Sequence, residues 1–186
     1  MSTADDWVYL EFTDLPREVA APATPLPPSI SLRAVKSVAD LEGVADLVNA
    51  AFDSDDENAV SFEQAAKLAW HPGPEIKQSY LAFDGDLPVG VGVGCLIVPV
   101  AGEPLSRGIV ELLAVRPQYW HQGIGSNLLH AVLSWLAEKG VSIVSSNLVD
   151  PIPLSMLERV GFSPTEPDTS TARHVHSMKT PPGACS

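Results

Sequence analysis

The sequence predicts an α/β fold in which a mixed, mostly antiparallel sheet is flanked by helices. Three observations indicate this fold. Short apolar segments with strand character alternate with segments whose apolar residues recur at helical spacing. Two neighbouring strand segments are joined by Asp84-Gly85, which is typical of the tight turn of an antiparallel hairpin. A long amphipathic helix then separates two later apolar strands, as expected when helices cover the faces of a sheet.

The composition indicates one domain that avoids nucleic acids and membranes. The chain has 186 residues, of which 45% are apolar, and this is enough to fill a core. Its 23 acidic and 11 basic side chains give a net charge of −12, which disfavours nucleic-acid phosphates and anionic bilayers. The longest apolar run, Val89 to Val100, is too short to span lipid, and the acidic N-terminus does not resemble a secretory signal. Two cysteines, Cys95 and Cys185, cannot form the disulfide framework of a small secreted domain. We therefore expect a soluble, cytoplasmic protein with no nucleic-acid or membrane partner.

The first 29 residues are predicted to form an arm and a proline-rich linker. Five of the 17 prolines fall within residues 16–28, where each fixes its own φ and disfavours helix in the preceding residue. The arm carries Trp7, Tyr9 and Phe12, which either form a short strand or dock on the main domain. The predicted division is an arm and linker at 1–29, a main domain at 30–180 and a tail at 181–186.

Capping residues mark where the helices begin and end. Ser37 with Asp40, and Ser61 with Gln64, each precede a segment of helical spacing. Lys139-Gly140 is a typical end for the long helix. The predicted strands cover 30–35, 80–83, 89–98, 109–115, 141–149 and 172–178, and the predicted helices cover 41–52, 61–70, 126–139 and 154–160.

The segment from Ile109 to Ser126 carries the clearest indication of chemistry, because a strand runs through a glycine turn into a helix. Gly123 and Gly125 permit positive φ and remove side-chain bulk, so the N–H groups of Gln122 to Ser126 can converge on a phosphate. The same glycines also suit a purely structural turn. Leu128 stands where a dinucleotide-binding fold needs its third glycine, and the chain has no GxxxxGK[ST] loop. Both of those phosphate-binding families are therefore excluded.

A longer pattern makes the turn more specific. Residues 113–129 read Leu-Ala-Val-x-Pro-x-Tyr-x-x-Gln-Gly-Ile-Gly-Ser-x-Leu-Leu, which resembles the acetyl-CoA signature of the GNAT superfamily of N-acetyltransferases. The short helix at 154–160, followed by Gly161-Phe162, resembles a second landmark of that family. The resemblance covers about residues 30–179. It implies a GNAT-like fold, acetyl-CoA as the cosubstrate and no metal.

The resemblance also implies which residues bind acetyl-CoA. The end of the strand pairs through its main chain with the pantetheine arm, and the turn holds the pyrophosphate through N–H groups. No basic side chain lies in the turn, so we expect CoA affinity to depend only weakly on salt. The implied residues are Leu113, Ala114, Val115, Gln122, Gly123, Ile124, Gly125, Ser126 and Asp150, the last of which stands where the family commonly has asparagine.

Two residues depart from the family pattern. Trp120 stands where an arginine or glutamine usually faces a phosphate, so backbone amides must contribute more to binding. Leu157 occupies the position of a tyrosine that protonates the leaving thiolate in many members. General acid catalysis is worth about 10²- to 10⁴-fold in rate. Another group or water must therefore supply the proton, or catalysis is weak.

Glu111 is predicted to be the catalytic base. It lies in an otherwise apolar strand, where a carboxylate could take a proton from an amine directly or through water. A backbone N–H near the end of that strand would stabilise the oxyanion. The alternative is a structural Glu111 that faces solvent or pairs with Arg107 or Arg116. The candidates near the thiolate are Ser155, which we predict to be catalytic, and Tyr119 and Asn147, and each of the three has a structural role as its alternative.

The sequence therefore predicts an enzyme that transfers an acetyl group from acetyl-CoA to the amine of a small molecule or peptide, by direct attack on the thioester. The acidic net charge favours a cationic acceptor. The acidic run at 53–57 is either a solvated loop or a lip of the acceptor site. Leu157 and Trp120 keep an alternative open, a GNAT-like CoA-binding or regulatory module with weak or no activity. A homodimer is one option for the assembly.

Overall fold

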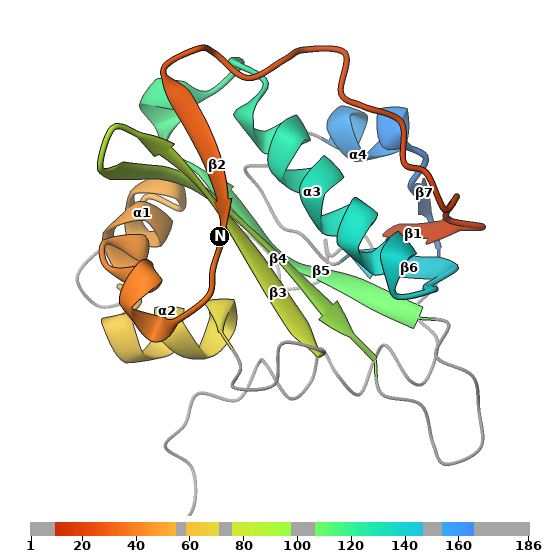
Figure 1. Cartoon of the computed structure of the whole chain (residues 1–186), viewed down its shortest axis with the longest axis horizontal. Coiled ribbons are helices and arrows are strands. Elements are labelled where there is room, and N and C mark those ends of the chain that lie inside the picture. Colours follow the sequence, from red (N-terminus) through yellow and green to blue (C-terminus); the bar gives the residue numbers. More distant parts are fainter. Residues whose placement is uncertain (1–9, 55–58, 71–75, 98–106, 147–153, 166–186) are drawn as a thin grey trace, which may run out of the picture.

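Within the residues that the structure describes, seven strands form one sheet in the order β2-β3-β4-β5-β6-β1-β7 (Figure 1). The computed structural model describes residues 10–54, 59–70, 76–97, 107–146 and 154–165. The strands are β1 (Leu10–Thr13), β2 (Ile30–Ala34), β3 (Lys77–Asp84), β4 (Leu87–Leu96), β5 (Arg107–Val115), β6 (Ile143–Ser146) and β7 (Ser163–Pro164). The α-helices are α1 (Val44–Ala51), α2 (Phe62–Ala69), α3 (Ile124–Glu138) and α4 (Leu154–Val160), and 3₁₀ helices lie at Val38–Leu41 and Pro117–Tyr119.

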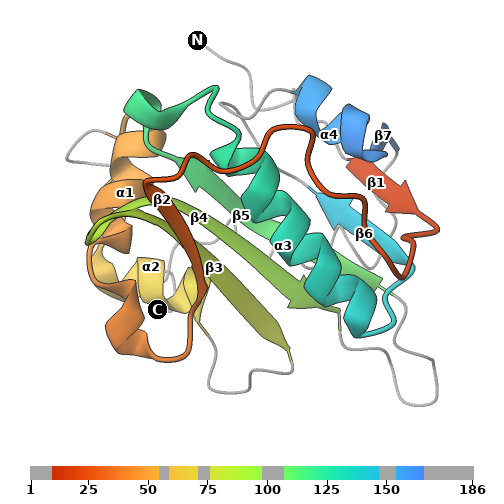
Figure 2. The same ribbon diagram turned by 45° about the horizontal axis from the view of Figure 1, so that its top comes forward.

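The sheet is mixed and mostly antiparallel, as predicted. β5 and β6 run parallel, and every other pair of neighbours runs antiparallel. β3 and β4 form the predicted hairpin, with Gly85 and Asp86 between them. Helix α3 covers one face of the sheet, and α1 and α2 cover the other (Figures 1 and 2).

Helix α3 packs closely against β4 because glycines of the strand face it. A Cβ at Gly90 would lie 2.8 Å from Cδ1 of Leu128, and one at Gly94 would lie 2.8 Å from Cγ1 of Val132. Since these positions lack side chains, the apolar face of the helix reaches the strand backbone. The helix begins at Ile124 rather than at the predicted residue 126. No helix in the described ranges is both long and apolar enough to cross a membrane.

Helices α1 and α2 bury a second apolar cluster against the opposite face, including Leu47, Leu81 and Leu112. The predicted cap of α2 is present, because Ser61 N donates to Gln64 Oε1 at 2.8 Å and Gln64 N donates back to Ser61 Oγ at 3.3 Å.

The single helix predicted at 41–52 is divided in two. Gly43 adopts a φ of +77°, which α-helical geometry does not allow, so the 3₁₀ helix before it and α1 after it are separate. The predicted capping residues act at the 3₁₀ helix instead. Asp40 Oδ2 accepts hydrogen bonds of 2.8 Å from the N–H groups of Lys36 and Ser37, and these bonds lower the pKa of Asp40.

The N-terminal segment is part of the sheet. Of the two alternatives for the arm, residues 10–13 form the strand, and β1 pairs antiparallel with both β6 and β7. Phe12 packs edge-on against Phe162, with 5.6 Å between ring centroids. Residues 14–28 then cross over α3 to reach β2 (Figure 2). Trp7, Tyr9 and the strand predicted at 172–178 lie outside the described residues.

Candidate active site

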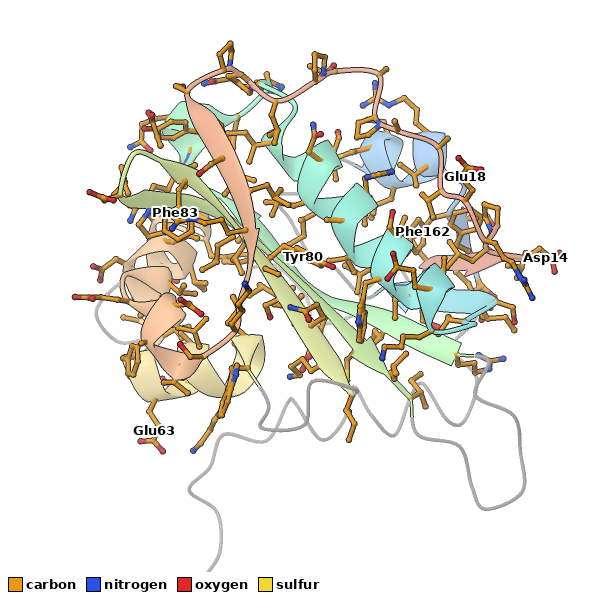
Figure 3. The ribbon with its side chains drawn as sticks, in the orientation of Figure 1. Asp14, Glu18, Glu63, Tyr80, Phe83 and Phe162 are labelled. Carbon is orange, nitrogen blue, oxygen red and sulfur yellow. The ribbon has the colours of Figure 1, made fainter. Side chains whose placement is uncertain are left out.

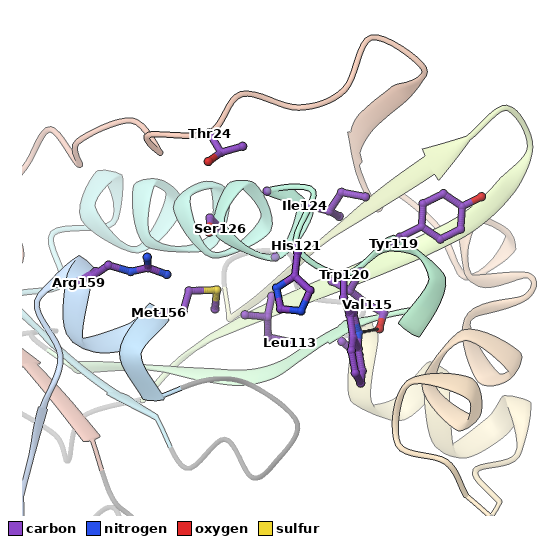
Figure 4. Close-up of a pocket in the computed structure, with 13 residues that line it drawn as sticks. Thr24, Leu113, Val115, Tyr119, Trp120, His121, Ile124, Ser126, Met156 and Arg159 are labelled. Carbon is purple, nitrogen blue, oxygen red and sulfur yellow. Dashed lines mark hydrogen bonds between the residues drawn. The ribbon is translucent and has the colours of Figure 1, made fainter.

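A pocket of about 450 Å³ opens where β5 ends and α3 begins (Figure 4). Four parts of the chain line it: the N-terminal segment, the end of β5, the turn into α3, and α4. Seven of the nine predicted cofactor-binding residues lie in its wall, all except Gln122 and Asp150. The lining residues are Thr24, Leu113, Ala114, Val115, Tyr119, Trp120, His121, Gly123, Ile124, Gly125, Ser126, Met156 and Arg159.

The turn into α3 presents a row of backbone N–H groups to this pocket. Gly123 is the N-cap of α3 with a φ of +79°, a left-handed conformation that favours glycine. The first N–H groups of a helix have no acceptor within the helix. No described residue accepts a hydrogen bond from the backbone N–H groups of residues 122–126. These donors lie at the positive end of the helix dipole, so they fit an anion such as a phosphate.

Among the described residues, β5 has an open edge beside the pocket from residue 111 to residue 115. Its parallel ladder with β6 runs from Arg107 opposite Ile143 to Val110 opposite Ser146. From residue 111 to residue 115, the only described strand that pairs with β5 is β4. Backbone groups along the open edge are therefore available to an extended ligand arm, which can pair with them as an added strand would.

Glu111 lies where this open edge begins, at a β-bulge in the pairing of β4 with β5. Val93 faces Leu112 and Gly94 faces Val110, which leaves Glu111 as the extra residue.

The Glu111 side chain is buried and forms an ion pair with Lys77. Lys77 Nζ is 2.6 Å from Glu111 Oε2, and the two side chains are 11% and 6% exposed respectively. The prediction that a structural Glu111 would face solvent or pair with Arg107 or Arg116 is therefore wrong, because the side chain is buried and its partner is Lys77. Arg107 pairs with Glu11 across 3.1 Å, and Arg116 Nε donates to the carbonyl oxygen of Pro88 at 2.9 Å.

The position of Glu111 relative to the pocket is specific. The glutamate is not among the lining residues, which begin two positions further along β5. Its partner Lys77 donates a hydrogen bond of 2.9 Å to the carbonyl oxygen of Leu68 near the end of α2, so the ion pair lies on the face of the sheet that α2 covers. The Glu111 carboxylate thus lies on the face of the sheet that α2 covers, whereas the pocket lies at the open edge of β5, beginning at Leu113.

Trp120 occupies one of the expected contacts to the pantetheine arm. Its indole Nε1 donates a 2.7 Å hydrogen bond to the carbonyl oxygen of Val115. The sequence predicts main-chain binding by Val115, but this carbonyl is already paired. The Trp120 side chain remains 41% exposed and forms part of the pocket wall (Figure 4).

The Tyr119 hydroxyl points away from the pocket, although the residue lines it (Figure 4). The hydroxyl donates a 3.0 Å hydrogen bond to Asp84 Oδ2, and this bond raises the pKa of Tyr119. It is therefore not directed at a thiolate in the pocket.

The remaining predicted site residues lie apart from the pocket. Ser155 is exposed on α4 but does not line the cavity, and Gln122 is exposed and donates to the carbonyl oxygen of Gln118 at 3.2 Å. Leu157 is a core residue with 1% exposure, so it offers the pocket no hydroxyl in place of tyrosine. Asp150, Asn147 and residues 55–57 of the acidic run lie outside the described residues.

Four lining residues have no binding or catalytic role predicted from the sequence: Thr24, His121, Met156 and Arg159. Met156 and Arg159 are three residues apart on α4, a spacing that places both on one face of a helix. This spacing is a signal that could have identified them. His121 adopts a φ of +60°, and its imidazole lies at the pocket (Figure 4). Arg159 brings a guanidinium group to a site whose turn has no basic side chain.

The donors and surfaces of the pocket fit the parts of acetyl-CoA. The N–H groups of the turn and Arg159 suit the pyrophosphate, and the open edge of β5 suits the amide-containing pantetheine arm. Among the described residues, no three His, Cys, Asp or Glu side chains gather closely enough to hold a metal ion.

Comparison with solved structures identifies the same fold. The chain is similar to a GCN5-related N-acetyltransferase from Sphaerobacter thermophilus, with 22% identity and a TM-score of 0.61 over 85% of this chain and 48% of the other. It is also similar to a GCN5-related N-acetyltransferase from Kribbella flavida, with 15% identity and a TM-score of 0.57 over 85% of this chain and 54% of the other. An aminoglycoside N-acetyltransferase, AAC(6')-Iy, in complex with CoA shares 19% identity and has a TM-score of 0.55 over 75% of this chain and 91% of the other. The chain thus spans about half the length of the first two proteins.

Sequence comparison assigns the family. No curated protein matches the sequence of this chain. The model of the acetyltransferase (GNAT) family matches residues 41–162, which include β5, the glycine turn, α3 and α4. Because this match covers more than half of the chain and contains most of the pocket, the chain belongs to the GNAT family of acetyltransferases.

Proposed function

We propose that this chain is an N-acetyltransferase that transfers the acetyl group of acetyl-CoA to the amine of a small molecule or peptide by direct attack on the thioester. The observation that carries the proposal is the meeting, at one pocket, of the turn into α3, whose N–H groups at residues 123–126 have no acceptor among the described residues, with the open edge of β5. The first feature suits a pyrophosphate, and the second suits an extended pantetheine arm. Membership of the GNAT family supports the same ligand.

In this proposal, the turn binds the pyrophosphate through the backbone N–H groups of Gln122, Gly123, Ile124, Gly125 and Ser126. Leu113 and Ala114 offer main-chain groups to the pantetheine arm. Val115 contributes its side chain and its backbone N–H, because its carbonyl oxygen accepts the hydrogen bond from Trp120. Support comes from the placement of these residues in one wall, with only Gln122 outside it. Asp150 remains a predicted contact.

We assign Glu111 as the base. The acceptor nitrogen must lose a proton when it bonds to the carbonyl carbon, and a carboxylate can take that proton directly or through water. An arm that starts at the turn and follows β5 toward Glu111 brings its thioester near the start of the open edge. A backbone N–H of β5 in this stretch would then donate to the carbonyl oxygen as negative charge develops there. Ser155 remains our candidate for protonating the thiolate, since α4 also carries the lining residue Met156.

The acceptor in this proposal is cationic before it loses its proton. A chain with a net charge of −12 attracts small amines, polyamines, aminoglycosides and peptide N-termini over acidic metabolites. The similarity to an aminoglycoside N-acetyltransferase supports testing aminoglycosides first.

A second function is favoured by one specific observation. Leu157 is fully buried where many relatives are expected to have the tyrosine acid, so among the described residues that position supplies no proton donor. A chain that binds CoA but transfers its acetyl group weakly or not at all would act as a sensor or as a partner of another protein.

Calorimetry and a thiol-release assay test the proposal together. We expect saturable binding of acetyl-CoA, and CoA release that depends on an added amine from a panel of aminoglycosides, polyamines and peptides. Glu111→Gln should lower turnover more than about tenfold without weakening CoA binding. Glu63→Gln is the matched control, because Glu63 points outward from α2 (Figure 3) and pairs only with exposed Lys67 among the described residues. Binding without release of thiol would favour the second function, and absence of binding would exclude both.

A further inference from the structure

The Lys77–Glu111 pair is a costly feature to bury. Lys77 Nζ lies 2.6 Å from Glu111 Oε2, and each side chain is about nine-tenths buried. Moving two charges out of water costs several kcal/mol per ion before their attraction is counted, and well-packed apolar pairs are often more stable. Stability alone is therefore a weak reason for these two residues to lie here.

The Lys77 ammonium also donates hydrogen bonds to backbone carbonyl oxygens of helix α2. Nζ donates to the carbonyl oxygen of Leu68 at 2.9 Å and approaches that of Lys67 at 3.4 Å. Both carbonyls belong to the last turn of α2, where the oxygens lack intrahelical partners and carry the negative end of the helix dipole. These contacts hold the ammonium in place independently of the carboxylate beside it.

The Glu111 carboxylate contacts the Lys77 ammonium through one oxygen and leaves its other oxygen without a partner among the described residues. Oε2 is fully buried and has no hydrogen bond of proper geometry, so the 2.6 Å approach of Nζ is an ionic contact rather than a directed bond. Oε1 has no partner among the described residues. The titratable groups that face Glu111 from the neighbouring strands are Lys77 on β3 and Cys95 on β4.

We infer that Lys77 is a positioning residue for acetyl transfer: its ammonium, fixed by the last turn of α2, holds the Glu111 carboxylate in an orientation in which Oε1 can accept the proton of the attacking amine. The inference rests on the proposed function. In the step it supports, the neutral amine nitrogen bonds to the thioester carbonyl carbon, the C=O π pair moves onto oxygen, and the N–H proton passes to Oε1. The carbonyl then re-forms as the C–S bond breaks, and CoA leaves as a thiolate that takes a proton from Ser155 or water. Lys77 keeps its three protons throughout and touches no reacting atom.

The turnover and the acetyl-CoA affinity of Lys77→Met together test this inference. Loss of the ammonium removes the group that orients the Glu111 carboxylate, so proton transfer to Oε1 should slow while CoA binding is unaffected. We expect kcat to fall by about tenfold at neutral pH, with the Kd for acetyl-CoA within about twofold of the wild type.

Further variants separate positioning from simple support of the fold. Lys77→Arg retains the charge that contacts the carboxylate, so it should keep most of kcat. Lys77→Met combined with Glu111→Gln should be no slower than Glu111→Gln alone, because Lys77 acts through Glu111. Lys67→Met is the matched control, since it removes an exposed lysine of α2 that pairs with Glu63.

Each outcome bears on a different claim. An active wild type whose Lys77→Met variant keeps the wild-type kcat, or whose double variant is slower than Glu111→Gln, overturns the inference and leaves the proposed function standing. If Lys77→Met does not fold, a folded Lys77→Arg variant that loses about tenfold in kcat also overturns it, and one that keeps most of kcat supports it. A wild type that releases no thiol with any amine overturns the proposed function and this inference with it.

Discussion

The side-chain amide of Asn127 donates a 2.9 Å hydrogen bond to the carbonyl oxygen of Thr24. The same nitrogen also donates at 2.9 Å to the carbonyl oxygen of Gly123, the N-cap of α3. One amide thus joins the N-terminal segment to the turn that presents N–H groups to the pocket. Because Thr24 lines that pocket, the segment before β2 is a wall of the site as well as a connection.

Asn127→Ala should weaken CoA binding more than it weakens the fold. A hydrogen bond of this kind contributes about 1 kcal/mol, so loss of both bonds should raise the Kd for CoA by about five- to thirtyfold if the turn loosens. Isothermal calorimetry measures the Kd, and urea titration measures the free energy of unfolding. Ser134→Ala on the same helix, outside the pocket, is the control. An unchanged Kd in Asn127→Ala would show that the turn holds its shape without this amide.

Gly123→Ala should damage the site beyond the strain of its left-handed conformation. A Cβ there would lie 2.8 Å from Cγ2 of Thr24 and 3.1 Å from its carbonyl oxygen, so the N-terminal segment must shift. Gly140 adopts nearly the same φ, +80° against +79°, but a Cβ at Gly140 meets nothing within 4 Å. Gly140→Ala therefore measures the conformational cost alone, about 1–2 kcal/mol. We expect both variants to lose that stability, and only Gly123→Ala to lose more than about tenfold in CoA affinity. Equal effects of the two variants on CoA affinity would argue against a steric role for Thr24.

The part of the site that could be predicted from the sequence is local. Gly123, Gly125 and the apolar end of β5 lie within a few residues of one another, so their spacing already defines a strand, a turn and a helix start. The start of α3 differs by only two residues from the prediction because Gly123 can act as the N-cap. The division of the helix at 41–52 depended on the conformation of Gly43, which composition does not reveal.

The part that could not be predicted depends on strand register and on segments far apart in the chain. Lys77 reaches Glu111 because β4 pairs with both β3 and β5, and because a bulge turns Glu111 toward α2. No pattern in the sequence fixes that register. Thr24 reaches the turn only because β1 enters the sheet between β6 and β7, so that residues 14–28 must cross α3 on the way to β2.

Arg159→Gln should reduce the salt dependence of CoA binding. The sequence predicts a weak dependence because the turn has no basic side chain, but Arg159 lines the same pocket from α4. Its Nε donates to the carbonyl oxygen of Ser155 at 3.0 Å, and the other guanidinium nitrogens, which have no partner in the described part of the chain, can meet a phosphate. Screening weakens exposed charge pairs as ionic strength rises. From about 50 mM to about 500 mM NaCl, the wild type should lose about threefold more affinity than the variant.

The control for this experiment is Arg33→Gln, because Arg33 stacks over Phe83, 3.9 Å from its ring centroid, outside the pocket. This variant should keep the wild-type salt dependence. Identical slopes for Arg159→Gln and the wild type would mean that backbone amides alone meet the phosphates.

Cys95 should make the fold sensitive to alkaline pH. Burial, reinforced by the charge of Glu111, raises the pKa of the Cys95 thiol from 9.0 to about 11. The folded state therefore favours the neutral thiol, and this contribution to stability is complete below pH 9. It is lost as the pH rises from about 9 to about 11, because the unfolded chain releases the proton first. We expect the free energy of unfolding to fall by about 1–2 kcal/mol across that range from this group.

Cys95→Val isolates this contribution, since valine suits a buried strand position and does not titrate. Urea titrations of both proteins at several pH values between 8 and 11 give the free energy of unfolding as a function of pH. Tyr80, whose pKa burial also raises, and Cys185 titrate in both proteins, so the difference between the two curves reports Cys95 alone. The wild-type curve should fall by about 1–2 kcal/mol more than the variant curve between about pH 9 and about pH 11. Parallel curves would mean that the Cys95 thiol ionises as readily in the folded protein as in the unfolded chain, which would contradict its burial beside a charged Glu111.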